Sequence, residues 1–231
     1  MKIGVPKEIK PQENRIGLTP ESVKVLTSSG HNVLVENNGG FEAGFYNNQY
    51  LDAGAKIVDK AEDIFSDADI IVKVKEPLSN EVKMIKENQI VFTYLHLAAA
   101  KELTEGLIKS KSVCIAYETV TDNNGRLPLL APMSAVAGRM SIQAGAHSLE
   151  KNQKGRGLLL GGAPGVEPAN VVILGGGVVG ENAALIATGM RAKVNIVDKS
   201  EDRLNQLKKM FGDKIIPQHS DKIDLEKLVS D

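Results

Sequence analysis

The stretch from Val171 to Asp198 constrains the fold more than any other part of this chain. It opens with an apolar, β-branched run, turns through Gly175 to Gly180 with the spacing Gly-x-Gly-x-x-Gly, continues as an alanine-rich helical pattern and closes on a second apolar run. A strand, a glycine turn and a helix in this order form the unit that binds a dinucleotide in α/β proteins. The stretch therefore predicts a Rossmann-like domain.

The glycines of this turn have separate tasks. Gly175 lets the chain turn tightly, Gly177 lets the backbone approach a pyrophosphate, and Gly180 lets the helix pack on the strand. Val178 and Val179 stand at the start of the helix, whose amide groups and dipole attract phosphates. The alternative is a glycine-rich turn that only packs. The strand, helix and acid around the turn favour a cofactor site.

Asp198 ends the strand after that helix, at residues 193–197. Its distance from the glycines is the one at which an acid binds the ribose hydroxyls of adenosine. A carboxylate there would repel a 2′-phosphate, so we expect NAD rather than NADP.

Composition excludes several other classes of protein. The 231 residues carry a net charge of −1, with 42% hydrophobic and 25% charged residues, so neither nucleic acid nor an anionic membrane is expected as a partner. The chain has no apolar run of membrane-spanning length, no signal peptide after Met1 and no spacing typical of metal ligands. We expect a cytoplasmic enzyme without a metal.

The first half of the chain alternates apolar runs with helical patterns. Strands are expected near residues 3–5, 32–36, 55–58, 69–75, 89–95 and 112–117, with helices near residues 19–29, 47–53, 60–66, 79–87 and 98–109. Such alternation predicts a parallel sheet with helices on its faces. The chain would then be α/β, with two doubly wound domains at residues 1–131 and 132–231. Residues 117–130 are expected to form either a hairpin or the exit from the first domain, and a helix from Pro132 to about Lys151 begins the second.

Three polar side chains would fall at the carboxyl ends of the first domain's strands, where such sheets bind ligands. They are Arg15, Lys75 and His96. Each has a simpler interpretation: Arg15 as a solvated loop cation, Lys75 as part of a polar strand face shared with Lys73, and His96 as a half-buried side chain satisfied by backbone. Together, a guanidinium, an ammonium and an imidazole suit a small carboxylate substrate and proton transfer.

Five motifs resemble those of alanine dehydrogenases, besides the glycine turn. They lie at residues 3–8, 13–20, 73–77, 95–98 and 130–134, so the likeness extends over essentially the whole chain. The wider family includes the NAD-binding α subunit of the proton-translocating transhydrogenase and the saccharopine dehydrogenases. A transhydrogenase-like subunit is therefore the alternative, but His96 and Lys75 favour the dehydrogenase, since transfer between two nicotinamides needs no imidazole over a substrate.

The resemblance implies reversible oxidative deamination of L-alanine to pyruvate and ammonium, with NAD as cofactor. Arg15 would bind the carboxylate, Lys75 would bond a substrate oxygen and act in catalysis, and His96 would transfer protons. The remaining roles implied are contact with the substrate for Met133, proximity to the cofactor phosphates for Ser134, and contact with NAD for Val178, Asp198, Arg203 and Ser220. The family also implies a homo-oligomer, commonly a hexamer.

A dinucleotide fold has about six strands in two halves. After the glycine turn we find strands only near residues 171–174, 193–197 and 214–216, then a helix near 225–229. We therefore expect that the second half of this domain is missing, that another chain could supply it, and that this chain alone is marginally stable and catalytically weak. A non-catalytic remnant that only binds partners is a further alternative.

Overall fold

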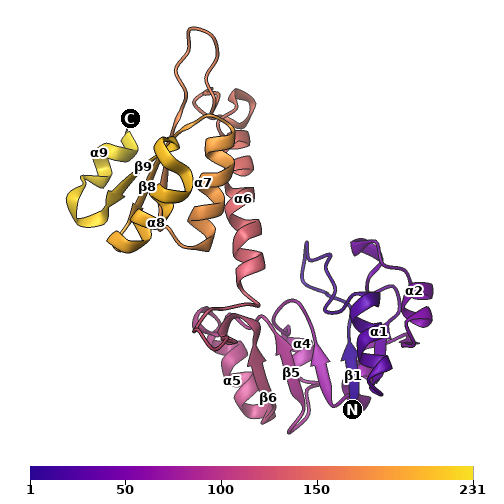
Figure 1. The fold of residues 1–231 in the computed structure, drawn as a ribbon. Helices are drawn as coiled ribbons and strands as arrows, with labels where there is room; N and C mark the ends of the chain where they lie inside the picture. The colour runs from indigo at the N-terminus through magenta and orange to yellow at the C-terminus, as the bar shows by residue number, and fades with distance from the viewer. Residues whose placement is uncertain (231) are drawn as a thin grey trace. The chain divides into compact units, whose positions relative to one another are not determined.

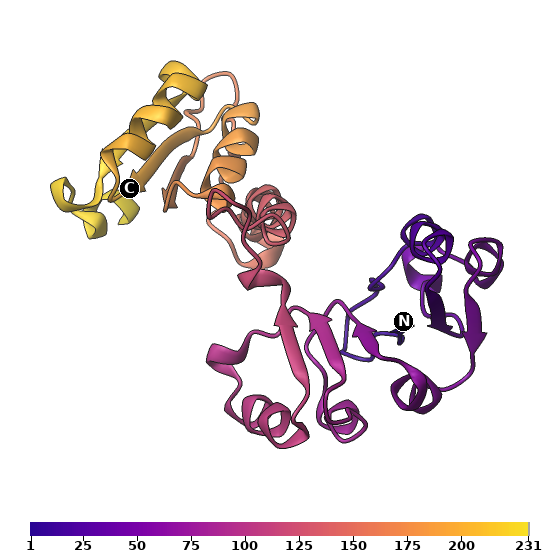
Figure 2. The ribbon, with the colours of Figure 1, turned by 60° about the horizontal axis from the view of Figure 1, so that its bottom comes forward.

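The computed structural model describes residues 1–230 and divides into two compact units, one from Met1 to Leu127 and one that begins at Pro128 (Figures 1 and 2). Each unit is built on its own parallel sheet. No helix among the described residues is both long and apolar enough to cross a membrane.

The first unit contains six strands, all paired in parallel. They are β1 (Lys2–Val5), β2 (Asn32–Glu36), β3 (Lys56–Val58), β4 (Ile70–Val72), β5 (Ile90–Thr93) and β6 (Val113–Ala116). Their order in the sheet is β3-β2-β1-β4-β5-β6, which is the order of a doubly wound dinucleotide fold. The predicted α/β class is confirmed, and β1 and β4, where the order reverses, lie in the middle.

Five helices connect these strands: α1 (Pro20–Ser28), α2 (Asn47–Asp52), α3 (Ala61–Asp67), α4 (Ser79–Val82) and α5 (Lys101–Ser110). The first begins where the sequence indicates, because the Thr19 hydroxyl accepts the N–H of Ser22 at 3.2 Å and proline occupies the first turn. The hydrophobic core forms two clusters, one around Val5 and one around Ile71. The side chains of Val5 and Ile71 have no exposed surface.

Several predicted elements were too long. The runs at 69–75 and 89–95 stop as strands at Val72 and Thr93, and the helix expected at 79–87 ends at Val82. The hairpin alternative for residues 117–130 is wrong, because a 3-10 turn, η3 (Tyr117–Thr119), stands where its first strand was expected. These differences matter for the site, since they turn strand positions into loop positions.

The second unit begins with the long helix α6 (Ala131–Ser148). Its strands and further helices are β7 (Asn170–Leu174), α7 (Val178–Gly189), β8 (Lys193–Asp198), α8 (Glu201–Phe211), β9 (Ile215–His219) and α9 (Leu225–Ser230). It also contains the 3-10 turns η4 (Lys151–Gln153), η5 (Gly212–Lys214) and η6 (Ser220–Lys222). The strands pair in parallel in the order β7-β8-β9. The alanine face of α7 packs on this sheet: Ala184 and Ala187 have no exposed surface and belong to the same cluster as Ile196.

Candidate functional site

The structure places the three polar residues of the first unit after adjacent strands. Arg15 lies in the loop that follows β1, Lys75 follows β4, and His96 follows β5. Since β1, β4 and β5 are neighbours in the sheet and run in parallel, all three residues stand at its carboxyl edge. This is the edge at which open α/β sheets bind ligands.

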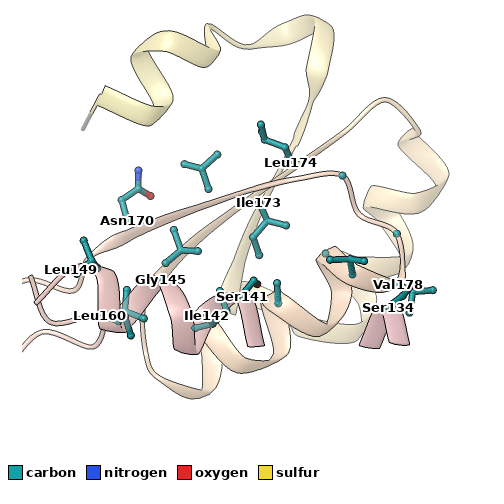
Figure 3. A pocket seen from close by; sticks show the side chains of 18 residues that line it. Ser134, Ser141, Ile142, Gly145, Leu149, Leu160, Asn170, Ile173, Leu174 and Val178 are labelled. Carbon is teal, nitrogen blue, oxygen red and sulfur yellow. The ribbon is translucent and has the colours of Figure 1, made fainter. Parts of the chain in front are cut away.

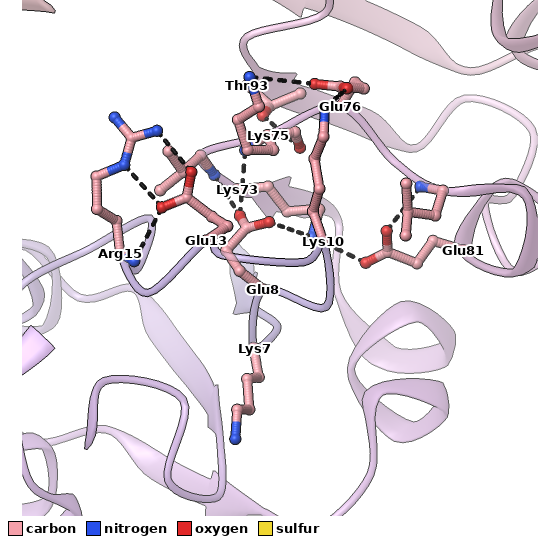
Figure 4. A network of polar contacts seen from close by, with 12 residues as sticks. Lys7, Glu8, Lys10, Glu13, Arg15, Lys73, Lys75, Glu76, Glu81 and Thr93 are labelled. Carbon is pink, nitrogen blue, oxygen red and sulfur yellow. Dashed lines mark hydrogen bonds and ion pairs between the residues drawn. The ribbon is translucent and has the colours of Figure 1, made fainter. Parts of the chain in front are cut away.

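Arg15 is held by a carboxylate that the sequence did not single out. Its Nε donates to Glu13 Oε1 at 2.7 Å and its Nη2 donates to Glu13 Oε2 at 2.6 Å (Figure 4). The Arg15 side chain lowers the pKa of Glu13, and the charge of Lys75 lowers it further. Arg15 is thus a loop cation that keeps 44% of its side chain exposed, as the simpler interpretation expects, but Glu13 orients its guanidinium, and the charge of Lys75 acts on the same carboxylate.

Lys73 and Lys75 have different environments, so the predicted polar strand face is wrong. The Lys73 ammonium is fully buried and pairs with Glu8 Oε2 at 3.1 Å and with Glu81 Oε1 at 2.8 Å (Figure 4). Lys75 keeps 22% of its side chain exposed, with its ammonium 3.7 Å from Glu76. Because the strand ends at Val72, the alternation that suggested a shared face does not continue through these lysines.

Glu8 also fixes the backbone that carries Lys75. Its Oε1 accepts the main-chain N–H of Val74 at 2.6 Å and that of Lys75 at 3.2 Å. One carboxylate group therefore joins the loop after β1 to the segment after β4, while its other oxygen binds the Lys73 ammonium. The Lys75 ammonium is therefore carried by a segment whose backbone Glu8 holds in place.

His96 has an unusual backbone conformation directly after β5. Its φ of 51° and ψ of 37° lie in the left-handed region, which costs a residue other than glycine about 1 kcal/mol or more. Glu118 Oε1 accepts the N–H of His96 at 2.8 Å and that of Leu95 at 3.1 Å. The imidazole stacks on the ring of Tyr94 with 6.0 Å between centroids and 19° between planes. His96 is exposed, so the half-buried alternative is wrong.

Opposing effects act on the acids and phenols around His96. Burial raises the pKa of Glu118, but hydrogen bonds from the N–H groups of His96, of Glu118 itself and of Leu95 hold that pKa below its usual value. Burial raises the pKa of Tyr94, which the nearby positive charge of Arg15 lowers in part. Glu118 is thus a charged acceptor at neutral pH, and Tyr94 both stacks with His96 and lies within electrostatic range of Arg15.

The glycine turn of the second unit has an open face and a closed face. Gly175 adopts a φ of +94°, and a Cβ placed on Gly175 or Gly177 would meet nothing within 4 Å. A Cβ on Gly180 would collide with the carbonyl oxygen of Gly175. Val178 and Val179 form the exposed first turn of α7 beside this open face. The arrangement leaves room for a phosphate at a helix N-terminus and fits the predicted dinucleotide.

Asp198 and Arg203 both bind the middle of the turn. Asp198 Oδ2 accepts the N–H of Gly176 at 2.6 Å and Oδ1 accepts that of Ser200 at 2.8 Å, and these two donors lower the pKa of Asp198. Arg203 Nε donates to the Gly176 carbonyl, and its Nη2 forms an ion pair with Glu181. In this structure Arg203 therefore braces the turn.

Ser220 and Ser134 reach this region from other elements. Ser220 begins the turn η6 after β9, and is exposed at the same edge of the sheet as Asp198, whose register partner is His219. Ser134 in α6 lines a cavity of about 700 Å³ together with Gly175, Gly177 and Val178 (Figure 3). Met133 lies next to Ser134 in the first turn of α6.

Sequence analysis missed four acids that hold these residues in place. They are Glu8, Glu13, Glu118 and Glu181. Glu8 and Glu13 belong to the motifs at residues 3–8 and 13–20, which was the only available signal for them. An isolated acid in a helix or turn gives no indication of which main-chain group it will bind.

Comparisons with known proteins assign the family. Models of the alanine dehydrogenase/PNT N-terminal and C-terminal domains match residues 4–137 and 141–231. The chain belongs to the alanine dehydrogenase/PNT family. Alanine dehydrogenase of Methanococcus maripaludis is 51% identical over 229 residues, which are 99% of this chain and 61% of that protein.

Two solved structures extend this result. An L-alanine dehydrogenase superposes with a TM-score of 0.91 at 51% identity, over 100% of this chain and 63% of that one. A transhydrogenase from Sinorhizobium meliloti superposes with a TM-score of 0.77 at 25% identity, over 94% and 64%. The chain spans about three fifths of the length of the curated relatives that it matches.

Proposed function

We propose that this chain provides the substrate-binding and NAD-binding parts of an alanine dehydrogenase, which interconverts L-alanine with pyruvate and ammonium. The observation that carries the proposal is the grouping of Arg15, Lys75 and His96 at the carboxyl edge of one sheet. The roughly 50% identity to alanine dehydrogenases supports it.

In this proposal Arg15 binds the substrate carboxylate with two parallel hydrogen bonds. Glu13 already engages Nε and Nη2 of the guanidinium and fixes its plane. The Lys75 ammonium donates to a substrate oxygen, where it stabilises negative charge as that charge develops. Glu8 binds the backbone of Lys75 and Glu13 binds the guanidinium of Arg15, so both cations are held before the substrate arrives.

His96 transfers protons in the same proposal. In the direction of deamination its imidazole takes a proton from the water that attacks Cα of the imino acid and gives it to the carbinolamine nitrogen. As the C–N bond breaks and the carbonyl of pyruvate forms, the imidazole takes the hydroxyl proton, and the ammonia that leaves is protonated to ammonium. Bound NAD supplies the hydride acceptor for Cα of alanine. Gly175, Gly177 and the first turn of α7 would bind its pyrophosphate, and Asp198 its adenosine ribose. Met133, Ser134, Val178, Val179, Arg203 and Ser220 are further proposed contacts.

Binding experiments on the 231-residue chain test the first part of the proposal. We expect Arg15→Ala to raise the Kd for pyruvate at least tenfold, because a charge-assisted pair is worth about 1.5–3 kcal/mol. The affinity for NADH should not change. Arg126→Ala, at an exposed arginine of the first unit, is the matched control. Equal pyruvate affinity in Arg15→Ala and wild type would contradict the assigned carboxylate site.

Turnover tests the second part. A chimera would continue this chain with the portion of the M. maripaludis enzyme that the match does not cover, and alanine-dependent NADH formation would be measured in the chimera and in the chain alone. We expect activity in the chimera and its loss in the His96→Ala form of it. Hydride transfer between two nicotinamides that survives His96→Ala, without oxidation of alanine, would instead indicate a transhydrogenase.

Assembly and location stay predictions. The resemblance implies a homo-oligomer, with the hexamer as the expected form, and a cytoplasmic enzyme. Light scattering of the chimera would measure the number of subunits, and a monomer at micromolar concentration would contradict the first of these predictions.

A further inference from the structure

His96 keeps its left-handed conformation without the freedom of a glycine. The residue lies three positions beyond the last strand residue, Thr93, and its φ of 51° is one that a side chain resists. Such a conformation persists only where the surroundings determine it. Groups that contact this short segment must therefore hold His96 in its left-handed conformation.

Glu118 contacts the segment at the two places that define its direction. Its carboxylate accepts two consecutive N–H groups, those of Leu95 and His96, at distances of 2.8–3.3 Å. The acid lies in η3, directly after the strand β6, which pairs with β5 through Thr93 and Ala116. The two strand ends are neighbours, so the acid of one reaches the backbone of the other without crossing the sheet.

We propose that Glu118 is a positioning residue for His96: its carboxylate binds the Leu95 and His96 N–H groups and thereby sets the direction in which the imidazole leaves the backbone. The stacked ring of Tyr94 then limits the rotation of the imidazole. The catalytic consequence rests on the proposed function, whereas the contact with the backbone does not. The two parts can therefore be tested separately.

Hydrogen exchange of single amides, resolved by NMR in the 231-residue chain, tests the contact. We expect Glu118→Ala to accelerate exchange of the Leu95 and His96 amides at least tenfold, and Glu118→Gln, which keeps one acceptor oxygen and the side-chain size, to accelerate it less. The amides of Val74 and Lys75, which Glu8 binds, should be unchanged. Unchanged exchange at Leu95 and His96 in both variants would overturn the proposal.

Glu105→Ala is the matched control for these variants. This glutamate is exposed on α5 and forms an ion pair along the helix surface with Lys101 at 4.0 Å. It should leave all four amides as they are in the wild type. Acceleration of the same two amides by the control would show that they respond to any loss of acid in the unit, and would overturn the proposal.

The catalytic consequence is tested by turnover of alanine. It is measured in the 231-residue chain or in the chimera, whichever oxidises alanine. We expect Glu118→Ala to lower kcat about 10- to 100-fold, as misplacement of a reacting group does, with KM for alanine within about threefold because Arg15 and Lys75 stay in place. On a His96→Ala background the same change should lower the residual rate no further. A further fall there would mean that Glu118 acts on the fold at large.

Failure of the proposed function and failure of the positioning role would give different results. Full activity in His96→Ala would remove the proposed function but leave the exchange result intact. Normal exchange and normal kcat in Glu118→Ala, with His96→Ala inactive, would remove only the positioning role.

Discussion

The carboxyl edges of the two sheets present different groups to a ligand. In the first unit the groups proposed to bind the ligand are side chains. Acids from other segments bind the backbone that carries them: Glu8 binds the N–H of Lys75, and Glu118 binds that of His96. In the second unit the candidate ligand groups are the backbone of the glycine turn and the first turn of α7. Here too an acid, Asp198, holds a main-chain N–H. Reactive side chains need a braced backbone, whereas phosphate binding needs a backbone without side chains.

The largest effect is expected where the first edge depends on buried charge. Lys73→Met would leave Glu8 and Glu81 together without their cation, and removing one partner of a buried ion pair costs about 3–5 kcal/mol. Urea unfolding followed by tyrosine fluorescence would measure this, since all four tyrosines lie in the first unit and the chain has no tryptophan. Lys83→Met, at an exposed lysine, should stay within about 0.5 kcal/mol of the wild type. A similarly small loss for Lys73→Met would mean that the edge does not depend on this ion pair.

The second edge should instead fail through sterics. Gly180→Ala would force its Cβ into the carbonyl of Gly175, and overpacking of this kind costs about 1–3 kcal/mol. The affinity for NADH should fall at least tenfold, as measured by the fluorescence of the bound nucleotide. Gly189→Ala, in the same helix but with open space at its Cβ, is the control and should bind NADH as the wild type does. Equal binding by both variants would contradict the assigned site.

The part of the site that lies in one stretch of sequence could be predicted. The acids that reach it from other segments and bind its backbone could not. Gly175, Gly180 and Asp198 belong to one motif whose spacing fixes their relation. Glu118 instead meets the N–H of His96 from 22 residues away, through the pairing of β5 with β6. Lys73 was misinterpreted for a related reason, because period-two alternation in the sequence outlasts the strand that it predicts. Beyond Val72 the Glu8 carboxylate accepts the N–H groups of Val74 and Lys75, and a side-chain to main-chain contact of this kind leaves no pattern in the sequence.

A smaller effect should come from the brace on the turn. Arg203 pairs with Glu181 while both side chains remain partly exposed, at 25% and 32%. Pairs of this kind contribute about 0.2–1 kcal/mol, so Glu181→Gln should raise the Kd for NADH about 1.4- to 5-fold. Glu201→Gln removes the exposed ion pair with Lys222 and should leave the Kd for NADH unchanged. Equal effects of the two variants would show that the surface charge, and not the brace, governs binding.

The smallest expected effect is a dependence of stability on pH. The N–H of Gly176, and then that of Ser200, lower the pKa of Asp198 in the folded chain. An acid with a depressed folded-state pKa adds stability above its unfolded pKa of about 3.9, and that stability is lost as the pH falls through the folded value. Asp198→Asn should therefore be less stable than the wild type at pH 6, and the gap should close towards pH 3. Urea unfolding followed by circular dichroism would measure both. A gap that persists at pH 3 would mean that Asp198 stabilises the turn by packing and not by its charge.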